Sequence, residues 1–317
     1  MLKNGYLAAT AVLALLTAAC GGSSGGSGNA QTGSLSVGVT DAPVDDAERV
    51  VVTFTGIELL DGDDQVRESF VFDAPISVDL LEQQGDQQFF LIQDRQVPVG
   101  VYDQVRLIVD GPANASCNSA QSDPNHPNFI TVDGTDYPLI VPSGAQTGLK
   151  IQGPITLAAG GSAAYTVDFD LRKSIAERGA TGCYNLRPVL RVVDNAAVGT
   201  LVGEVDPALL ADASCTSDPV SGVGAAVYVY SGGGQTPDDF DGSDPEPLTT
   251  ALLQPGGGDG VPLSFSYEVG FLLEGDYTVA LSCQAGDDAP APADDDIQFI
   301  LPADALIVAG EATQLDF

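Results

Sequence analysis

Alternation of apolar and polar residues is the main pattern of this chain, and it predicts β-strands. In Ser34 to Thr40 every second residue is Leu or Val, and Arg49 to Leu60 is rich in β-branched residues. The clearest alternation is Ala163 to Leu171, where large apolar side chains occupy every second position. Short segments of this kind recur from residue 34 onward and are separated by turn-forming residues. The pattern therefore predicts an all-β fold of the sandwich type.

The same pattern restarts at Val198 and divides the predicted strands into two sets. Strands are expected at Val198 to Val205, at Gly224 to Tyr230, and in the segment from Ser264 to Leu281. We therefore predict two β-sandwich domains, Ig-like or prealbumin-like, over residues 34–195 and 198–317. A single helical turn is expected from Arg172 to Arg178, ended by Gly179.

The first residues have the pattern of a secretory signal peptide. Lys3 precedes an apolar run of about ten residues, which is shorter than the ~20 residues that a membrane-spanning helix needs. We therefore predict a signal peptide over residues 1–19, the alternative being an anchor helix or a buried core helix. Residues 20–33 follow, and from Gly21 onward they contain no apolar side chain larger than Ala. Such a segment predicts a flexible tether.

The end of the predicted signal peptide resembles a bacterial lipobox. Ala18 and Ala19 precede Cys20, although Thr17 stands where Leu is usual. The resemblance implies that Cys20 is lipidated and becomes the mature N-terminus, so the expected partner is a membrane, reached through an N-terminal lipid anchor. Gly21 follows Cys20 in place of the Asp that marks inner-membrane retention. The expected location is therefore the bacterial cell envelope, at the outer membrane.

The charge of the chain is strongly negative and unevenly distributed. The formal net charge is −33, and all 11 Lys and Arg residues lie at or before Arg191. Neutralising nucleic-acid phosphates requires clustered basic residues, so nucleic acid is excluded as a partner. Binding of the protein body to an anionic membrane surface is disfavoured for the same reason.

The excess of acidic residues has two interpretations, and one of them is calcium binding. Asp239, Asp241 and Asp244 surround Gly242, and carboxylates around a glycine turn are typical calcium ligands. A second acidic loop contains Asp287 and Asp288 followed by residues 294–296. The EF-hand spacing does not occur, and the other reading is a solvated acidic surface. No other cofactor is expected.

Four cysteines besides Cys20 are candidates for disulfides in an exported protein. These are Cys117, Cys183, Cys215 and Cys283, which allow three connectivities. We expect Cys117–Cys183 and Cys215–Cys283, because the predicted domain boundary falls between the two pairs. A zinc site is the alternative, but the cysteines lack CxxC spacing.

Two sets of charged residues are expected to meet on neighbouring strands. Arg187 and Arg191 share one strand face by their even spacing, as do Asp168 and Asp170. A structural cross-strand charge network is one interpretation, and an anion pocket is the other.

Nothing in the sequence indicates a catalytic centre. His126 is the one histidine and lies in a loop with two Pro and two Asn residues, so it is expected to be a loop residue. No G-x-S-x-G motif follows a predicted strand, as a nucleophile elbow requires. A glycosidase with paired carboxylates is a further alternative, but acidic pairs are too frequent here for their spacing to test it. We therefore predict that the protein is not an enzyme.

Four segments in the first half resemble one bacterial lipoprotein family. They are Thr40 to Asp45, Val105 to Asp110, Asp168 to Ser174 and Leu186 to Asn195. Together they resemble the family called domain of unknown function 4382, over residues 34 to 195. The resemblance implies a signal-bearing envelope protein and carries no catalytic residues.

The second half resembles the carboxypeptidase-regulatory-like, or prealbumin-type, β-sandwich module. The resemblance rests on Gly224 to Tyr230, Ser264 to Val269 and Gly270 to Leu281, and it departs in an acidic insertion between Tyr230 and Leu248. It implies a non-catalytic module. Related surface modules form Lys–Asn isopeptide bonds, but this half contains no Lys.

Together these patterns predict a non-enzymatic cell-envelope lipoprotein with a binding or structural role. The alternatives are a carbohydrate-binding or adhesion module, an accessory protein of a hydrolase, and a calcium-binding surface protein. The chain has no Trp for stacking on a sugar ring, although it has nine Tyr. Another envelope protein or a glycan is the expected partner.

Overall fold

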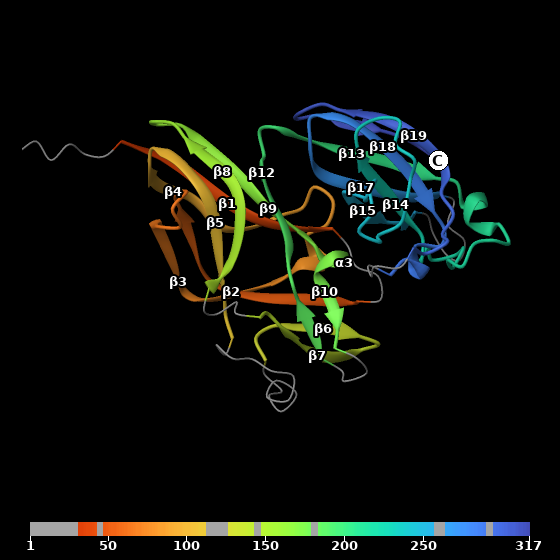
Figure 1. Ribbon diagram of the computed structural model, residues 1–317, viewed down its shortest axis with the longest axis horizontal. Helices are drawn as coiled ribbons and strands as arrows, with labels where there is room; N and C mark the ends of the chain where they lie inside the picture. Colours follow the sequence, from red (N-terminus) through yellow and green to blue (C-terminus); the bar gives the residue numbers. More distant parts are fainter. Residues whose placement is uncertain are drawn as a thin grey trace, which may run out of the picture. The chain divides into compact units, whose positions relative to one another are not determined.

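The structure is a computed structural model, and seven stretches of the chain are described in it (Figure 1). They are residues 31–42, 47–111, 126–142, 147–178, 183–256, 264–289 and 294–317. The predicted signal peptide, Cys20 and Cys117 lie outside them. No helix in these stretches is long and apolar enough to cross a membrane.

Two β-sheets are built from the strands between residues 32 and 194. The first has the order β12-β9-β1-β4, and the second has the order β10-β11-β7-β6-β2-β5-β8 with β3 also paired to β2. The strands are β1 (Thr32–Ala42), β2 (Arg49–Leu60), β3 (Val66–Asp79), β4 (Phe89–Pro98), β5 (Gly100–Val109), β6 (Phe129–Val132), β7 (Thr135–Ile140), β8 (Leu149–Leu157), β9 (Ser162–Asp170), β10 (Ile175–Glu177), β11 (Tyr184–Leu186) and β12 (Val189–Asp194).

Two further four-stranded sheets are built from residues 198 to 314. Their orders are β16-β17-β13-β20 and β15-β14-β18-β19. The strands are β13 (Val198–Val205), β14 (Ala226–Ser231), β15 (Thr249–Leu252), β16 (Gln254–Gly256), β17 (Ser264–Leu273), β18 (Gly275–Ser282), β19 (Ile300–Ile307) and β20 (Ala312–Gln314). Below, residues 31–195 are called the N-terminal half and residues 196–317 the C-terminal half.

The all-β prediction is confirmed, and several strands coincide with the predicted segments. β2 and β13 have the predicted bounds, and β9 differs from its predicted segment by one residue at each end. Successive side chains of a strand point to opposite faces of the sheet; in β13 burial largely alternates accordingly, whereas β2 is buried on both faces. Most strand pairs are antiparallel, whereas β1 pairs with β9, β7 with β11, and β13 with β20 in parallel.

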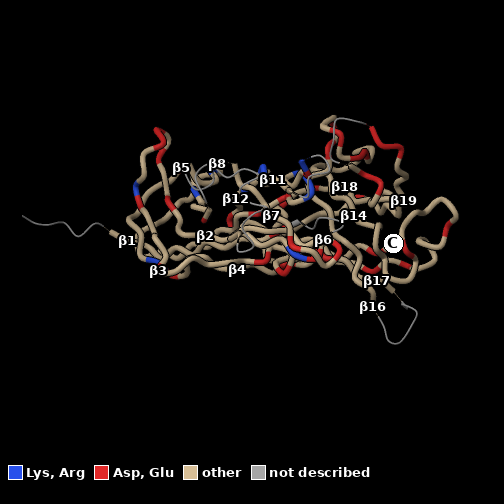
Figure 2. Tube along the Cα trace, turned by 90° about the horizontal axis from the view of Figure 1, so that it is seen from below, with Lys and Arg blue, Asp and Glu red and all other residues tan. Residues whose placement is uncertain are grey.

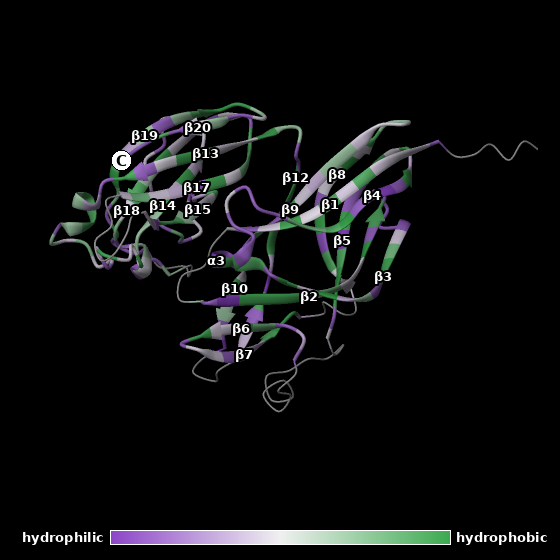
Figure 3. Ribbon diagram, turned by 180° about the vertical axis from the view of Figure 1, so that it is seen from behind, coloured by the Kyte–Doolittle hydropathy of each residue, from purple (hydrophilic) through white to green (hydrophobic). Residues whose placement is uncertain are grey.

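Each half encloses its own hydrophobic core. In the N-terminal half, Phe54 of β2 and Phe169 of β9 are fully buried and meet edge to face, with ring centroids 6.4 Å apart. β2 is hydrophobic along most of its length (Figure 3). Fully burying one such side chain contributes about 1.5–3 kcal/mol, so these facing sheets stabilise each other as the two layers of a sandwich.

The core of the C-terminal half lies on one face of β14, and a second cluster lies on the other. Val227 and Val229 pack into the core with residues of β17 and β18. Tyr228 and Tyr230 point the opposite way and pack against Phe240. β14 is therefore buried on both faces, and the cover of its second face includes the acidic insertion that follows it.

The helix between β9 and β10 is shorter than the sequence predicts. α3 spans Leu171–Ser174, and Asp170 caps it by accepting a hydrogen bond from the Lys173 backbone N–H. Ile175–Glu177, which was predicted as helix, forms β10 because it pairs with β11. Three short 3-10 turns are also present among the described residues: η1 (Leu80–Glu82), η2 (Pro207–Ala211) and η3 (Ala285–Asp287).

Cys215 and Cys283 are joined by a disulfide, one of the two expected bridges. It connects the segment after η2 to the end of β18 across 68 residues of sequence. Cys183 is also disulfide-bonded, but its expected partner Cys117 lies outside the described residues.

Removing the Cys215–Cys283 bridge should destabilise the C-terminal half. We expect a Cys215→Ala/Cys283→Ala double variant to lose about 2–5 kcal/mol of unfolding free energy, because the disulfide restricts the unfolded chain. Urea unfolding followed by circular dichroism measures this loss, and non-reducing peptide mapping of the unmodified protein is the control. An unchanged unfolding midpoint would contradict the expectation.

Candidate functional site

Three basic side chains, those of Arg172, Lys173 and Arg191, lie where the two halves of the chain meet. Six of the 11 Lys and Arg residues fall between Lys150 and Arg191, whereas acidic residues gather on loops around β18 and β19 (Figure 2). At this boundary a cavity of about 300 Å³ opens between β9, α3 and β12 on one side and the segment before β15 on the other. Its lining consists of Asp168, Asp170, Lys173, Val189, Leu190, Arg191, Ser231, Glu246, Pro247, Leu248 and Thr249.

One predicted cross-strand ion pair is present at this cavity. Arg191 of β12 lies directly opposite Asp168 of β9 in the strand register. The Nε and Nη2 atoms of Arg191 are each 2.6 Å from Asp168 Oδ2. Arg187, in contrast, is exposed and forms no ion pair with any described residue. The predicted network therefore holds for Arg191, and the prediction for Arg187 is wrong because its side chain faces solvent.

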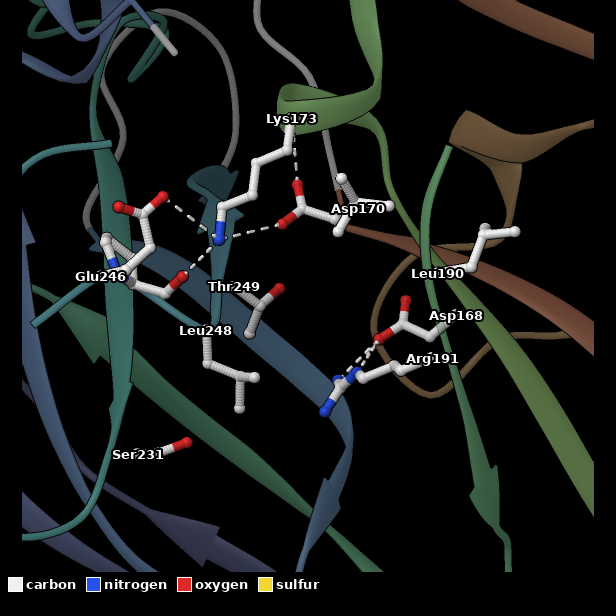
Figure 4. A pocket seen from close by; sticks show the side chains of 11 residues that line it. Asp168, Asp170, Lys173, Leu190, Arg191, Ser231, Glu246, Leu248 and Thr249 are labelled. Atoms are coloured by element: carbon white, nitrogen blue, oxygen red, sulfur yellow. Dashed lines mark hydrogen bonds and ion pairs between the residues drawn. The ribbon is translucent and has the colours of Figure 1, made fainter. Parts of the chain in front are cut away.

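Lys173 links the two halves through several acceptors (Figure 4). Its Nζ atom lies 3.5 Å from both Asp170 Oδ2 and Glu246 Oε1, and it donates a 2.7 Å hydrogen bond to the Pro247 carbonyl oxygen. The same ammonium lies 4.7 Å from the centre of the Phe240 ring. The cations that line the cavity are thus already neutralised by protein carboxylates, which disfavours the anion-pocket interpretation.

Arg172, the neighbour of Lys173, is buried against the C-terminal half. Its side chain is 3% exposed, and Nη1 donates to the Tyr228 hydroxyl at 2.9 Å and to Asp288 Oδ2 at 3.2 Å. The Tyr228 hydroxyl in turn donates to Asp288 Oδ2 at 2.6 Å. The guanidinium carbon also lies 5.7 Å and 5.5 Å from the ring centres of Tyr228 and Phe240. Sequence analysis missed this contact, although Arg172 stands in the segment that carries the family resemblance.

The environment of Asp288 explains why it needs these partners. Burial raises the pKa of the Asp288 carboxyl, and the hydrogen bond from Tyr228 and the charge of Arg172 act in the opposite direction. A buried carboxylate without such partners is strongly unfavourable. Arg172 and Asp288 therefore form a buried ion pair, to which each half contributes one residue.

Backbone contacts extend this boundary beyond the ion pairs. Gly270 of β17 packs so closely on the segment after η1 that a Cβ atom at this position would lie 2.1 Å from the Gly85 carbonyl oxygen. Beside it, Glu268 Oε1 accepts a 2.8 Å hydrogen bond from the Asp86 backbone N–H. Residues Gln31–Phe317 form one compact unit. The division into domains 34–195 and 198–317 stays a prediction.

Asp41 is a buried carboxyl group on β1 at the same boundary. It is 4% exposed and lines a cavity of about 20 Å³ together with Asp168, Arg191 and residues of β15 and β17. Burial raises the pKa of Asp41 well above its usual value, and the negative charges of Asp168 and Asp170 raise it further. Proton binding at Asp41 therefore favours the folded state.

The acidic residues of the C-terminal half form two groups that share Asp239. One oxygen from each member of a group lies within 4.8 Å of the others, and the groups are Asp238–Asp239–Asp241 and Asp239–Asp288–Asp295. Asp244, predicted as a calcium ligand, is exposed and belongs to neither group. Asp288 and Asp295 were missed as partners of Asp239 because they come from the other acidic loop, and sequence spacing does not show that the two loops meet.

His126 is held in a structural role by its neighbours. It is 8% exposed, and its Nδ1 atom lies 2.6 Å from the Asn128 carbonyl oxygen. The Asn128 side chain bonds the Thr53 backbone N–H and the Asp110 carbonyl oxygen, each at 2.8 Å. Among the described residues, no hydrogen bond joins His126 to a hydroxyl or a carboxylate.

A larger cavity of about 700 Å³ also lies between the halves. It is lined by residues near β6, by the turn of residues 221–224 and by residues 252–255. No aromatic side chain is found among its described lining residues. Such a surface gives a sugar ring no platform to stack on.

Loss of Arg172 should destabilise the protein far more than loss of Arg187. We expect Arg172→Ala to lower the unfolding free energy by about 3–5 kcal/mol, because it leaves Asp288 buried without its cation. Arg187→Ala is the matched control and should change it by no more than about 0.5 kcal/mol. Chemical denaturation of both variants measures the difference, and similar losses would contradict the assigned roles.

Asp41→Asn should stabilise the protein increasingly as the pH rises. The folded-state pKa of Asp41 is above its unfolded value, so the stability that its proton contributes is present at low pH and is lost as the pH rises through the folded pKa. Asparagine carries no charge to desolvate, so the variant should melt above wild type at neutral pH and close to it near pH ~4. Melting curves across this range test the trend, with the exposed Asp63→Asn as control, and a pH-independent difference would count against it.

Comparison with solved structures gives only distant likenesses. A leucine-rich repeat protein from Bacteroides thetaiotaomicron is 10% identical, with a TM-score of 0.23 over 90% of this chain and 26% of that one. The present chain thus spans about a quarter of that protein. The minor pilin GBS52 of Streptococcus agalactiae gives 9% identity and a TM-score of 0.20, over 89% and 94% of the two chains. The fimbrial anchor protein Mfa2 of Porphyromonas gingivalis gives 10% identity and a TM-score of 0.23, over 89% and 90%. At these TM-scores the likenesses carry no inference about the site.

Sequence comparison finds a family match in the N-terminal half. No curated protein matches the chain. A family model does match it, and the match covers residues 32–188, from the first strand through β11. This range holds the buried Arg172, three of the four segments on which the resemblance rested and the start of the fourth. Residues 32–188 match the family described as domain of unknown function (DUF4382), as that resemblance implied.

Proposed function

We propose that the protein is a non-enzymatic, lipid-anchored envelope protein whose body serves in binding or structure. The observation that carries this proposal is that the basic side chains at the boundary form ion pairs within the protein. Arg172, Lys173 and Arg191 are each paired with protein carboxylates, and two of them join the N-terminal half to the C-terminal half. Their charges hold the body together and are not directed at a substrate.

The N-terminal sequence supports the location. The signal-peptide pattern ends in Ala18-Ala19-Cys20, and lipidation of Cys20 would anchor the chain in a membrane. Thr32 and Gly33 belong to β1, so the predicted tether is shorter than residues 20–33, and the ten residues from Gly21 to Ala30 would have a root-mean-square reach of about 15–20 Å as a flexible coil. Gly21 after Cys20 supports the outer membrane. The protein would thus display a rigid double sandwich at a short distance from the lipid surface.

The partner in this proposal is another envelope component. The resemblance of the C-terminal half to the carboxypeptidase-regulatory-like module supports a non-catalytic binding role. An adhesion role toward a glycan is the second candidate, but the lining of the 700 Å³ cavity offers no aromatic platform. A protein surface is therefore the preferred partner.

Substitution of Cys20 tests the anchor. In a Gram-negative bacterial host that expresses the full chain, we expect wild type in the membrane fraction and Cys20→Ser in the soluble envelope fraction, because the variant has no site for acylation. Ser23→Ala in the same segment is the control and should fractionate with wild type. A Cys20→Ser protein that stays in the membrane fraction would refute the lipid anchor.

The binding role is tested with the same two proteins. Cross-linking in intact cells, followed by purification and mass spectrometry, should recover a defined envelope partner with wild type and less of it with Cys20→Ser. A glycan array probed with the purified full chain distinguishes the adhesion alternative. Hydrolysis of any envelope polymer by the purified chain would contradict the non-enzymatic proposal.

A further inference from the structure

Three aspartates from separate segments converge beside the buried Arg172. Asp239 lies in the insertion between β14 and β15, Asp288 follows η3, and Asp295 lies before β19. One carboxylate oxygen from each lies within 4.8 Å of the other two. Asp288 and Asp295 are about 50 residues from Asp239 in sequence, so tertiary folding creates this group.

Asp239 has an unsatisfied oxygen in the interior. The residue is 1% exposed, and its Oδ2 accepts a 2.6 Å hydrogen bond from the Asp295 backbone N–H. Its Oδ1 atom is buried and has no hydrogen-bond partner. A buried carboxylate oxygen normally carries at least one partner, because leaving it unsatisfied costs much of its lost hydration. This oxygen is therefore available to bind a cation.

The hydrogen bonds of the other two aspartates hold the group in place. Asp288 Oδ1 accepts from the Phe240 backbone N–H at 3.2 Å, and Asp295 Oδ2 accepts from the Ala289 backbone N–H at 2.8 Å. Each aspartate thus fixes the backbone of a neighbouring segment. The three carboxylates are positioned by the fold and are not loose surface side chains.

The charge of the group is not balanced by the protein. Asp288 is paired with Arg172, while Asp239 and Asp295 have no ion pair among the described residues. The charge of Asp239 also contributes to raising the pKa of Asp288, although burial is the larger cause. Three carboxylates and one guanidinium leave two negative charges, which a divalent cation would neutralise.

We propose that Asp239, Asp288 and Asp295 bind a calcium ion. Carboxylate oxygens are hard ligands that suit Ca²⁺, and loop segments provide the irregular geometry that Ca²⁺ accepts more readily than Mg²⁺. Waters and backbone carbonyls complete the coordination. The site differs from the one that sequence spacing suggests, because Asp288 and Asp295 take the places of Asp241 and Asp244.

Calcium at this position ties together the segments that surround β14. It joins the insertion that carries Phe240 to the segment that enters β19, next to the Arg172–Asp288 contact between the halves. Binding should therefore stiffen the boundary as well as the two loops. The proposal does not depend on the proposed function or on the lipid anchor.

Terbium luminescence provides a direct test on the purified full chain in detergent. Tb³⁺ replaces Ca²⁺ at oxygen sites, and the chain contains no Trp, so tyrosine is the only strong sensitiser. The Tyr228 hydroxyl is 2.6 Å from Asp288 Oδ2, close enough to transfer excitation to an ion in this group. We expect tyrosine-excited Tb³⁺ emission that CaCl₂ displaces, with half-saturation by Ca²⁺ at about 0.1–1 mM, the range of extracellular calcium modules. The melting temperature should rise over the same range.

Four variants locate the ion. Asp239→Asn and Asp295→Asn should each weaken Ca²⁺ binding at least about tenfold. The exposed residues Asp244→Asn and Asp296→Asn are matched controls in the same two loops and should bind like wild type. In the presence of chelator, Asp239→Asn should melt at or above wild type, because it removes a buried charge. A purely structural role for Asp239 would give a lower melting temperature instead.

Three results would overturn the proposal. The first is no calcium-dependent emission or melting shift at millimolar Ca²⁺. The second is binding that survives in both Asp239→Asn and Asp295→Asn. The third is binding that Asp241→Asn abolishes and Asp295→Asn leaves intact, which would place the ion at the other group. If Asp239→Asn fails to fold, Asp295→Asn decides the question, because Asp295 is partly exposed.

Discussion

The Arg172 guanidinium is the interaction on which the arrangement of this protein depends. Arg172 lies on the single helical turn α3 of the N-terminal half. Its guanidinium contacts Tyr228, Phe240 and Asp288 of the C-terminal half. Asp170 fixes that turn by capping it, and the β9 and β12 strands fix Asp170. A small local structure in one half therefore places a charge inside the other. The ion pair between Arg172 and Asp288 therefore joins the two halves.

Buried ion pairs contribute little net stability compared with apolar packing, but breaking one is costly. This asymmetry suits a boundary between two sandwiches that have separate hydrophobic cores. The hydrophobic effect is not directional, whereas a guanidinium that is bonded to one carboxylate and one hydroxyl fixes the relative position of the two halves. The close approach at Gly270 adds a steric requirement to the electrostatic one. These directional contacts fix how the two halves meet.

The sequence predicts the strands well because runs of β-branched residues and alternation of apolar and polar residues are both typical of strands. It predicts β2, β9 and β13 almost to the residue. It also places Arg191 opposite Asp168, since even spacing and neighbouring strands are enough to suggest that pair. It fails for Arg187, which shares even spacing with Arg191 but faces solvent. It also misses Asp288 as the partner of both Arg172 and Asp239, because those contacts depend on how two loops and two sandwiches pack, and no local pattern records that packing.

The position of β1 in its sheet has a mechanical consequence. β1 is the first described strand, and it lies inside its sheet with β9 paired in parallel along one edge and β4 antiparallel along the other. A pull transmitted through the chain before Thr32 would act along the strand axis and shear both ladders at once. In this geometry many hydrogen bonds share the load, whereas a strand at a sheet edge pulled sideways would release them one after another. If the chain is held through the residues before Thr32, as proposed, tension would load β1 in this shear geometry.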